Sequence, residues 1–308
     1  MNFAPQCASA ALLVRPAAFG HNAQTAASNR FQRVGTLDAT TAHARARAEF
    51  DALCAALAAA GVALCVADDT PEPLKPDAVF PNNWVSFHRD GTVVLYPMQA
   101  ANRRIERRVQ IIEAVSERLG FQVRRRLDLA HHESQGRFLE GTGSLVLDHA
   151  TRTAYACLSP RTDAALVREW ARLMDYEPVT FDAADAAGVP VYHTNVLLHV
   201  GTRCVVVAAA AIAAADRTRV LDRLGASGRE LILIDAAAMA SFAGNLLEFA
   251  ARGGRSVLVM SAAARAALAP DGYGRLAAGV DSVLAVPVPT IEWLGGGSVR
   301  CMLAEVPV

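Results

Sequence analysis

Residues 84–96, WVSFHRDGTVVLY, are the clearest structural signal in the sequence. Two apolar runs, 84–87 and 93–96, lie on either side of the dipeptide Asp90-Gly91. Asp-Gly is typical of the tight turn between two antiparallel strands, because both central positions of that turn have a positive φ. The stretch therefore predicts a β-hairpin.

The same plan recurs along the chain, with strand starts at residues 84, 144, 196, 246 and 298, about 50 to 60 residues apart. The further apolar runs are 144–147 with 154–158, 196–200 with 204–207, 246–249 with 257–260, and a last strand at 298–304 that we expect to pair with 12–15. Helical patterns are found at 42–60, 104–119, 163–173, 213–224 and 262–268. A unit of strand, strand, helix and strand repeated at this period predicts an α/β fold in which five units close into a ring.

An ordinary doubly wound sheet is the alternative that this pattern leaves open. No linker divides the sequence, so residues 1–308 are expected to form a single domain.

The composition is typical of a globular protein whose positive and negative charges balance. Hydrophobic residues make up 53% of the chain and charged residues 19%, which excludes a disordered protein. Thirty basic residues balance thirty acidic ones, so binding of nucleic acid or of a membrane surface by bulk charge is not expected. The longest apolar run, 204–215, is too short for a spanning helix, which needs about 18 residues or more.

The cysteine pattern favours a reducing compartment, and we expect the protein in the cytoplasm. The six cysteines form no CxxC pair and no disulfide or zinc spacing. No basic segment precedes the apolar stretch 8–14, so a secretory leader is not expected either. His131 and His132 lack the spacing of metal ligands and are assigned to a surface loop.

Polar residues gather where the first strand of each unit begins. They are Asn82 and Asn83, Glu140 to Gly143, His193 to Asn195, Asn245, and Cys301 inside the last strand. In a closed ring these positions would meet at the centre. A thiol that attacks carbon, a histidine that moves protons and a carboxylate that orients them are the parts of thiol catalysis. Taken singly, each of these residues is more often structural, and a cysteine above all is usually a buried core residue.

Six ordered segments together resemble the guanidine-modifying, or pentein, superfamily of amidinotransferases, arginine deiminases and dimethylarginine hydrolases. The segments are 13–16 (LVRP), 80–83 (FPNN), 139–143 (LEGTG), 158–162 (LSPRT), 193–196 (HTNV) and 295–301 (GGGSVRC), and they cover nearly the whole chain. The resemblance implies a five-bladed α/β-propeller whose active site lies in the central channel.

Carried over from this superfamily, Cys301 is the nucleophile, His193 its acid/base partner and Glu140 the carboxylate that works with them. Deiminases place acidic residues at the positions of Asn83 and Asn195, where they bind a cationic guanidinium, and a further acidic residue at the position of Gly143. In this sequence none of the three positions carries an acidic residue. An asparagine, which offers both donors and an acceptor, suits an uncharged ureido group. The resemblance thus implies a citrulline hydrolase that needs no metal or organic cofactor.

The implied reaction begins when Cys301 attacks the ureido carbon and ornithine leaves. Water then hydrolyses the S-carbamoyl enzyme, which gives ammonia and carbon dioxide. Either His193 or Glu140 could protonate the departing nitrogen.

Three further residues are expected to bind the substrate. Arg103 and Arg161 are candidates for clamping its carboxylate, since a guanidinium fork binds a carboxylate through two parallel hydrogen bonds. Phe80 is expected to pack on the planar ureido group.

Two other functions stay open. One is an enzyme for a guanidino substrate, namely an arginine dihydrolase or deiminase or a dimethylarginine hydrolase. The other is a pentein that only binds, without chemistry. The expected partner is a small amino-acid substrate, and a homodimer is compatible with the sequence.

Overall fold

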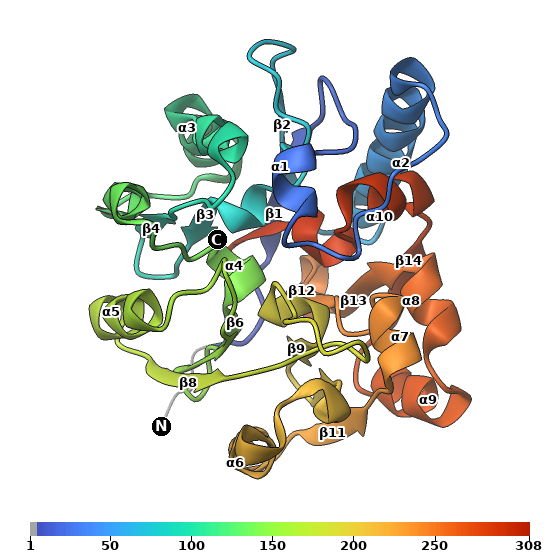
Figure 1. The fold of residues 1–308 in the computed structure, drawn as a ribbon. Coiled ribbons are helices and arrows are strands. Elements are labelled where there is room, and N and C mark those ends of the chain that lie inside the picture. The colour runs from blue at the N-terminus through green and yellow to red at the C-terminus, as the bar shows by residue number, and fades with distance from the viewer. Residues whose placement is uncertain (1–4) are drawn as a thin grey trace.

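The computed structural model describes residues 5–308, which form five sheets of three strands each. Figure 1 shows the sheets grouped around one centre. In every sheet the middle strand is antiparallel to the strand that precedes it in its unit and parallel to the one that follows. The α/β class and the repeated unit are therefore confirmed, and the doubly wound alternative is wrong because no sheet of these residues exceeds three strands.

The strands follow the predicted order around the ring. They are β3 (Val85–Phe87), β4 (Thr92–Leu95) and β5 (Arg125–Asp128); β6 (Val146–Asp148), β7 (Thr153–Cys157) and β8 (Glu177–Phe181); β9 (Leu198–Val200), β10 (Cys204–Val207) and β11 (Glu230–Leu233); β12 (Leu247–Ala250), β13 (Ser256–Ser261) and β14 (Ser282–Val286); and β15 (Ala304–Val306), β1 (Ala10–Arg15) and β2 (Ala63–Asp68).

The first hairpin forms at the predicted place, but its turn differs from the predicted one, because only Gly91 and not Asp90 has a positive φ. Residues 88–91 form a four-residue loop in which the N–H of Gly91 donates to the carbonyl of His88 at 2.9 Å. Gly91 has a φ of +80°, and a Cβ there would lie 2.6 Å from the carbonyl oxygen of Gln122, so only glycine fits. The side chain of Asp90 accepts the backbone N–H of Thr92 at 2.9 Å.

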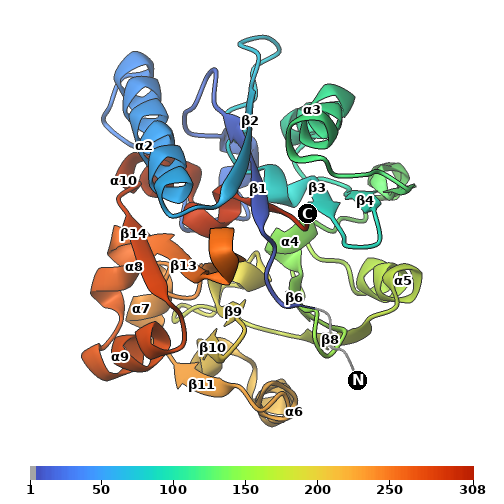
Figure 2. The same cartoon turned by 180° about the vertical axis from the view of Figure 1, so that it is seen from behind.

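The helices lie on the periphery of the ring in both views (Figures 1 and 2), each between the two parallel strands of its unit. They are α2 (Ala39–Ala59), α3 (Val109–Leu119), α5 (Ala164–Met174), α6 (Ala214–Gly225), and the pair α8 (Ala262–Ala267) and α9 (Pro270–Ala278). The predicted helix at 104–119 starts late, because residues 101–106 form a 3-10 turn that buries Arg103 and Glu106. Short helices α1 (Ala23–Ala26), α4 (Gly141–Ser144), α7 (Ala236–Ala240) and α10 (Pro289–Gly295) complete the chain.

In the last unit the strand begins later than the predicted strand at 298–304. Residues Val299–Met302 form a 3-10 turn, closed by the N–H of Cys301 on the carbonyl of Ser298 at 2.9 Å, and the strand β15 begins only at Ala304. Its pairing partner is β1, as expected, with Leu12 opposite Ala304. Cys301 therefore lies in a turn that precedes a strand. The direction of its side chain is not set by the alternation of side chains along a β-strand.

The same construction repeats at the other first strands, where 3-10 turns at Pro81–Asn83 and Thr194–Val196 and the short helix α4 precede β3, β9 and β6. These turns contact one another near the centre of the ring. The fold thus brings together the polar residues that stand before each first strand.

Residues 5–308 contain no helix with the length and apolarity needed to span a bilayer. The assignment of His131 and His132 to the surface is confirmed for the exposed His131 but wrong for His132, which is buried in the same 3-10 turn and contacts Glu169 at 3.2 Å.

Candidate active site

A narrow cavity at the centre of the ring brings the predicted site residues together. Its lining includes Phe80, Asn83, Arg103, Arg161, His193 and Cys301. Glu140 and Asn195 stand directly behind it, hydrogen-bonded to His193 and to Cys301 respectively. The free space is about 10 Å³, which is room for roughly one water molecule.

His193, Glu140 and Arg161 form a buried charge network. His193 Nε2 lies 2.9 Å from Glu140 Oε2, and Arg161 Nη1 donates to the same oxygen at 3.4 Å. Burial lowers the pKa of His193 to about 4, although Glu140 acts in the opposite direction. Burial alone would raise the pKa of Glu140, but Arg161 and the bond from His193 outweigh it and lower that pKa to about 2.

At neutral pH, Glu140 is therefore a carboxylate and His193 a neutral imidazole. Because a carboxylate only accepts hydrogen bonds, the proton of His193 lies on Nε2. Its Nδ1 then carries a lone pair that faces Gly143, where a Cβ would come within 2.7 Å of this nitrogen. The arrangement presents an oriented base in the cavity.

Two amide side chains hold the sulfur of Cys301. Nδ2 of Asn195 donates to Sγ at 3.6 Å and Nδ2 of Asn245 at 3.4 Å. Asn245 is itself fixed, because its Oδ1 accepts the N–H of Arg300 at 3.1 Å and its Nδ2 also reaches the carbonyl of Asn195 at 2.9 Å. Sequence reasoning placed Asn245 before the fourth strand but gave it no function.

Asn83 has one amide end occupied and one free. Its Oδ1 accepts Nη1 of Arg103 at 2.8 Å, and since a guanidinium only donates, the oxygen must point to Arg103. Its Nδ2 is buried without a partner among residues 5–308. This nitrogen would be 2.5 Å from a Cβ on Gly143, so no side chain fits between Asn83 and His193.

Arg103 and Arg161, which were predicted to bind the carboxylate of the substrate, differ in the groups that they already bind. Arg103 makes a two-bond pair with Glu106 at 3.0 and 2.9 Å and also bonds Asn83, so its main role in this state is to orient that amide. Arg161 donates to the carbonyl of Thr25 at 2.7 Å and to the hydroxyl of Ser28 at 2.9 Å. Both belong to a loop that contains the short helix α1 and lines the cavity through Thr25 and Asn29.

Four residues of the lining were missed by the sequence analysis. Asp77 accepts two hydrogen bonds on Oδ2, from Asn22 and Thr25, while its buried Oδ1 has no partner among residues 5–308. The other three are Tyr192, Thr25 and Asn29. Asp77 stands three residues before Phe80, so the neighbourhood of that motif was the available signal, whereas nothing local marks the loop around Thr25.

Phe80 packs where glycines leave space for it. A Cβ on Gly295 or on Gly297 would come within 2.9 or 3.0 Å of its ring. The glycine run 295–297 therefore serves close packing of an aromatic ring beside Cys301.

Known proteins resemble this chain in sequence family and in fold. A family model described as N,N dimethylarginine dimethylhydrolase, eukaryotic, matches residues 15–308. The chain belongs to this family. The dimethylarginine dimethylhydrolase family lies within the pentein superfamily, and its members are hydrolases of carbon–nitrogen bonds, so the protein is an enzyme of that kind and not a pentein that only binds.

Solved structures share the fold of this family member. The N-terminal domain of ArgZ, a cyanobacterial arginine dihydrolase, superposes with a TM-score of 0.73 at 17% identity, over 96% of this chain and 97% of that one. Unliganded AgrE gives 0.74 at 18%, over 97% and 39%. The enzyme DDAH from Pseudomonas aeruginosa, bound to citrulline, gives 0.66 at 15%, over 97% and 99%. A search among curated proteins finds no match.

Proposed function

We propose that this protein hydrolyses the ureido group of citrulline to ornithine, ammonia and carbon dioxide, with Cys301 as the nucleophile. The observation that carries the proposal is the free, buried N–H of Asn83 beside His193. A ureido carbonyl accepts that hydrogen bond. A guanidinium has donors only and would leave the N–H unpaired at a cost of about 1–3 kcal/mol.

The charge at the reacting end supports the same substrate. Asn83, Asn195 and Gly143 present no carboxylate there, and Glu140 is already paired with Arg161 and bonded to His193. The free carboxylate oxygen of the lining belongs to Asp77, which the α-ammonium of the substrate would occupy, so a cationic guanidinium would have no counter-ion of its own at the reacting end. A neutral ureido group avoids that penalty.

In the first step Cys301 Sγ bonds to the ureido carbon. His193 Nδ1 takes the thiol proton and passes it to the δ-nitrogen of the substrate, the C–N bond breaks, and ornithine leaves the S-carbamoyl enzyme. The ionised state of Glu140 and its bond to His193 support His193, and not Glu140, as the proton donor. The N–H of Asn83 stabilises the oxygen on which negative charge develops.

In the second step water replaces ornithine. His193 Nδ1 removes a proton from the water, which attacks the thioester carbon, and the proton returns to the departing sulfur of Cys301. The product is carbamic acid, which decomposes to ammonia and carbon dioxide.

The amino-acid end of citrulline would lie between Asp77 and Arg161. The unpaired Oδ1 of Asp77 suits the α-ammonium, and Arg161 suits the carboxylate once it releases Thr25 and Ser28. Because the cavity holds only about 10 Å³, the loop that carries Thr25 and Ser28 must move before citrulline enters.

A guanidino substrate is the second candidate, and the relatives favour it. ArgZ is an arginine dihydrolase, and the matched family is named for dimethylarginine. Arginine would give ornithine with two equivalents of ammonia, and dimethylarginine would give citrulline and dimethylamine.

One assay separates these functions. Ornithine, ammonia and citrulline are measured after incubation with citrulline, arginine or dimethylarginine, using the intact enzyme and Cys301→Ala. We expect ornithine and ammonia in equal amounts from citrulline and none from the variant. Product only from arginine or dimethylarginine would replace citrulline as the substrate.

The proposal includes the architecture around the site. We infer that the five sheets are the blades of one α/β-propeller, that residues 1–308 are a single domain, and that the enzyme works in the cytoplasm as a homodimer. A single cooperative unfolding transition and the mass from sedimentation test the domain and the dimer.

A further inference from the structure

A second cavity of about 180 Å³ lies at the opposite ends of the strands that form the catalytic site. The strand β3 begins two residues after Asn83 and ends directly before His88, which lines this cavity. A strand rises about 3.3 Å per residue, so these two side chains are roughly 15 Å apart along the chain. β15, which follows Cys301, likewise leads to Glu305 in the second cavity. We call it the rear cavity.

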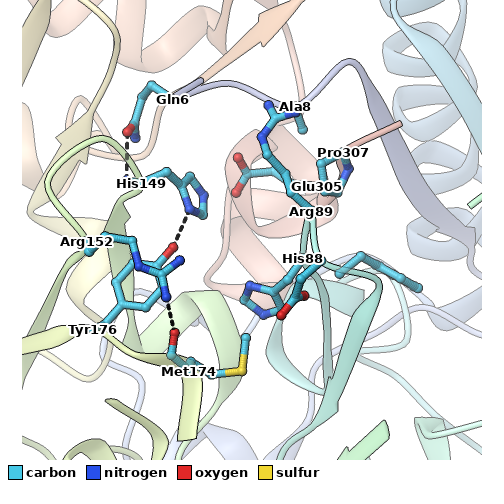
Figure 3. Close-up of a pocket in the computed structure, with 12 residues that line it drawn as sticks. Gln6, Ala8, His88, Arg89, His149, Arg152, Met174, Tyr176, Glu305 and Pro307 are labelled. Carbon is cyan, nitrogen blue, oxygen red and sulfur yellow. Dashed lines mark hydrogen bonds between the residues drawn. The ribbon is translucent and has the colours of Figure 1, made fainter. Parts of the chain in front are cut away.

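The rear cavity carries charges of both signs. Arg89, Arg152 and Glu305 line it (Figure 3), and so does Asp90. Within residues 5–308, Arg89 has no carboxylate partner and its hydrogen bond goes to the carbonyl of Cys7. Asp90 likewise has no cationic partner there and accepts the backbone N–H of Thr92. The cavity therefore offers one guanidinium and one carboxylate that are free to pair.

Two imidazoles and an apolar floor complete the lining. Figure 3 shows the rings of His88 and His149 turned toward the cavity, and His149 Nδ1 lies 2.6 Å from the hydroxyl of Tyr176. Burial lowers the pKa of both histidines, that of His88 to about 3, so they are uncharged hydrogen-bonding groups at neutral pH. Phe87, Met174 and Tyr176 are buried and supply apolar surface.

We propose that the rear cavity binds a small zwitterionic α-amino acid as an effector, at a site separate from the catalytic one. Its carboxylate would pair with Arg89, its ammonium with Asp90 and Glu305, and its side chain would lie on the apolar floor. Arg152 already pairs with Asp175 and Glu305 with Arg300, so Arg89 and Asp90 are the charges of the lining that have no ionic partner among residues 5–308. A ligand with both charges can pair with each of them, whereas a plain anion or a plain cation can pair with one. A cavity of about 150 Å³ holds benzene, so this one suits a ligand of about eight heavy atoms.

Hydrogen bonds connect the rear cavity to the nucleophile. Glu305 Oε2 accepts Nη2 of Arg300 at 3.1 Å, and the backbone N–H of Arg300 donates to Asn245, which in turn holds the sulfur of Cys301. An ammonium bound at Glu305 competes with Arg300 for that carboxylate. The coupling, which rests on the proposed role of Cys301, is expected to change kcat.

Binding is tested on the full chain as Cys301→Ala, so that no turnover is needed and the result does not depend on which substrate is correct. The probes for titration calorimetry are L-norvaline, pentanoate and pentylamine, which share a chain length and differ in charge. We expect norvaline to bind at least tenfold more tightly than the other two. Equal affinity of all three, or no binding of norvaline, would overturn the proposal.

Variants locate the bound norvaline. Arg89→Gln and Glu305→Gln should each weaken it tenfold or more, whereas Arg255→Gln, an exposed arginine outside both cavities, should change it less than twofold. If Asp77→Asn loses norvaline binding and Arg89→Gln retains it, norvaline binds in the catalytic cavity and the proposal is wrong. With the active enzyme, norvaline should alter kcat for the substrate that the product assay identifies, and this effect should vanish in Arg89→Gln. An unchanged kcat would refute the coupling.

Discussion

Arg103 fixes which end of Asn83 faces the substrate. Nη1 of Arg103 donates to Oδ1 of Asn83 at 2.8 Å, while the other bonds of the guanidinium hold it on Glu106. The buried pair of Arg103 and Glu106 thus orients the amide, so that Asn83 presents an N–H and not a carbonyl to the reacting group. In the proposed reaction this N–H donates to the ureido carbonyl.

Asn83→Asp therefore removes the donor and keeps the shape. We expect kcat for citrulline to fall about 10²-fold to 10³-fold, which is typical for the loss of one oxyanion donor. The new carboxylate pairs with Arg103, so the thermal midpoint should change little, and this separates a catalytic from a folding defect. An unchanged kcat would show that Asn83 does not contact the ureido oxygen.

Asn245 is expected to position the sulfur of Cys301. Asn245→Asp keeps the acceptor for the N–H of Arg300 but replaces the N–H that reaches Sγ at 3.4 Å with an oxygen. We expect kcat to fall at least about tenfold, a KM within about twofold of the original, and slower alkylation of Cys301 by iodoacetamide, read by peptide mass spectrometry. A purely structural role would lower the thermal midpoint and leave the alkylation rate of the folded protein unchanged.

Gly143 keeps Asn83 and His193 close together. In Gly143→Ala the new Cβ would lie 2.5 Å from Nδ2 of Asn83 and 2.7 Å from Nδ1 of His193, so one of them must move. A displacement near 1 Å can cost about 10²-fold in rate. Gly274→Ala is the matched control, because that helical glycine has nothing within 4 Å of the added carbon. Its activity should be unchanged, and equal activity of both variants would contradict the packing.

The sequence predicted the hairpins because their signals are local. Alternating apolar runs around Asp90-Gly91 need no distant partner, and the spacing of such units indicated the ring. The turn at Cys301 was missed, since it depends on a bond to Ser298 and on Asn245 from another unit. The loop that carries Thr25 was missed for the same reason: its hydrogen bonds go to Arg161 and Asp77, far along the chain.

Buried histidines make stability depend on pH. Burial lowers the pKa of His88 and His199 to about 3 and that of His193 to about 4, whereas an unfolded histidine titrates near 6.5. Between about pH 6.5 and 4 the unfolded chain binds protons that the folded chain does not, so the free energy of unfolding falls as the pH falls. Each histidine contributes up to about 1.4 kcal/mol per pH unit in this window.

Urea unfolding at pH 8, 7, 6 and 5 measures this dependence. From pH 8 to 7 these three histidines are neutral in both states and add little slope, whereas from pH 6 to 5 the slope should be steep. His199→Gln should reduce that slope by about 1.4 kcal/mol per pH unit, because the variant lacks one of the three histidines that bind a proton in the unfolded chain only. A slope that His199→Gln leaves intact would mean that this side chain is protonated inside the folded protein, in spite of its burial beside Arg300.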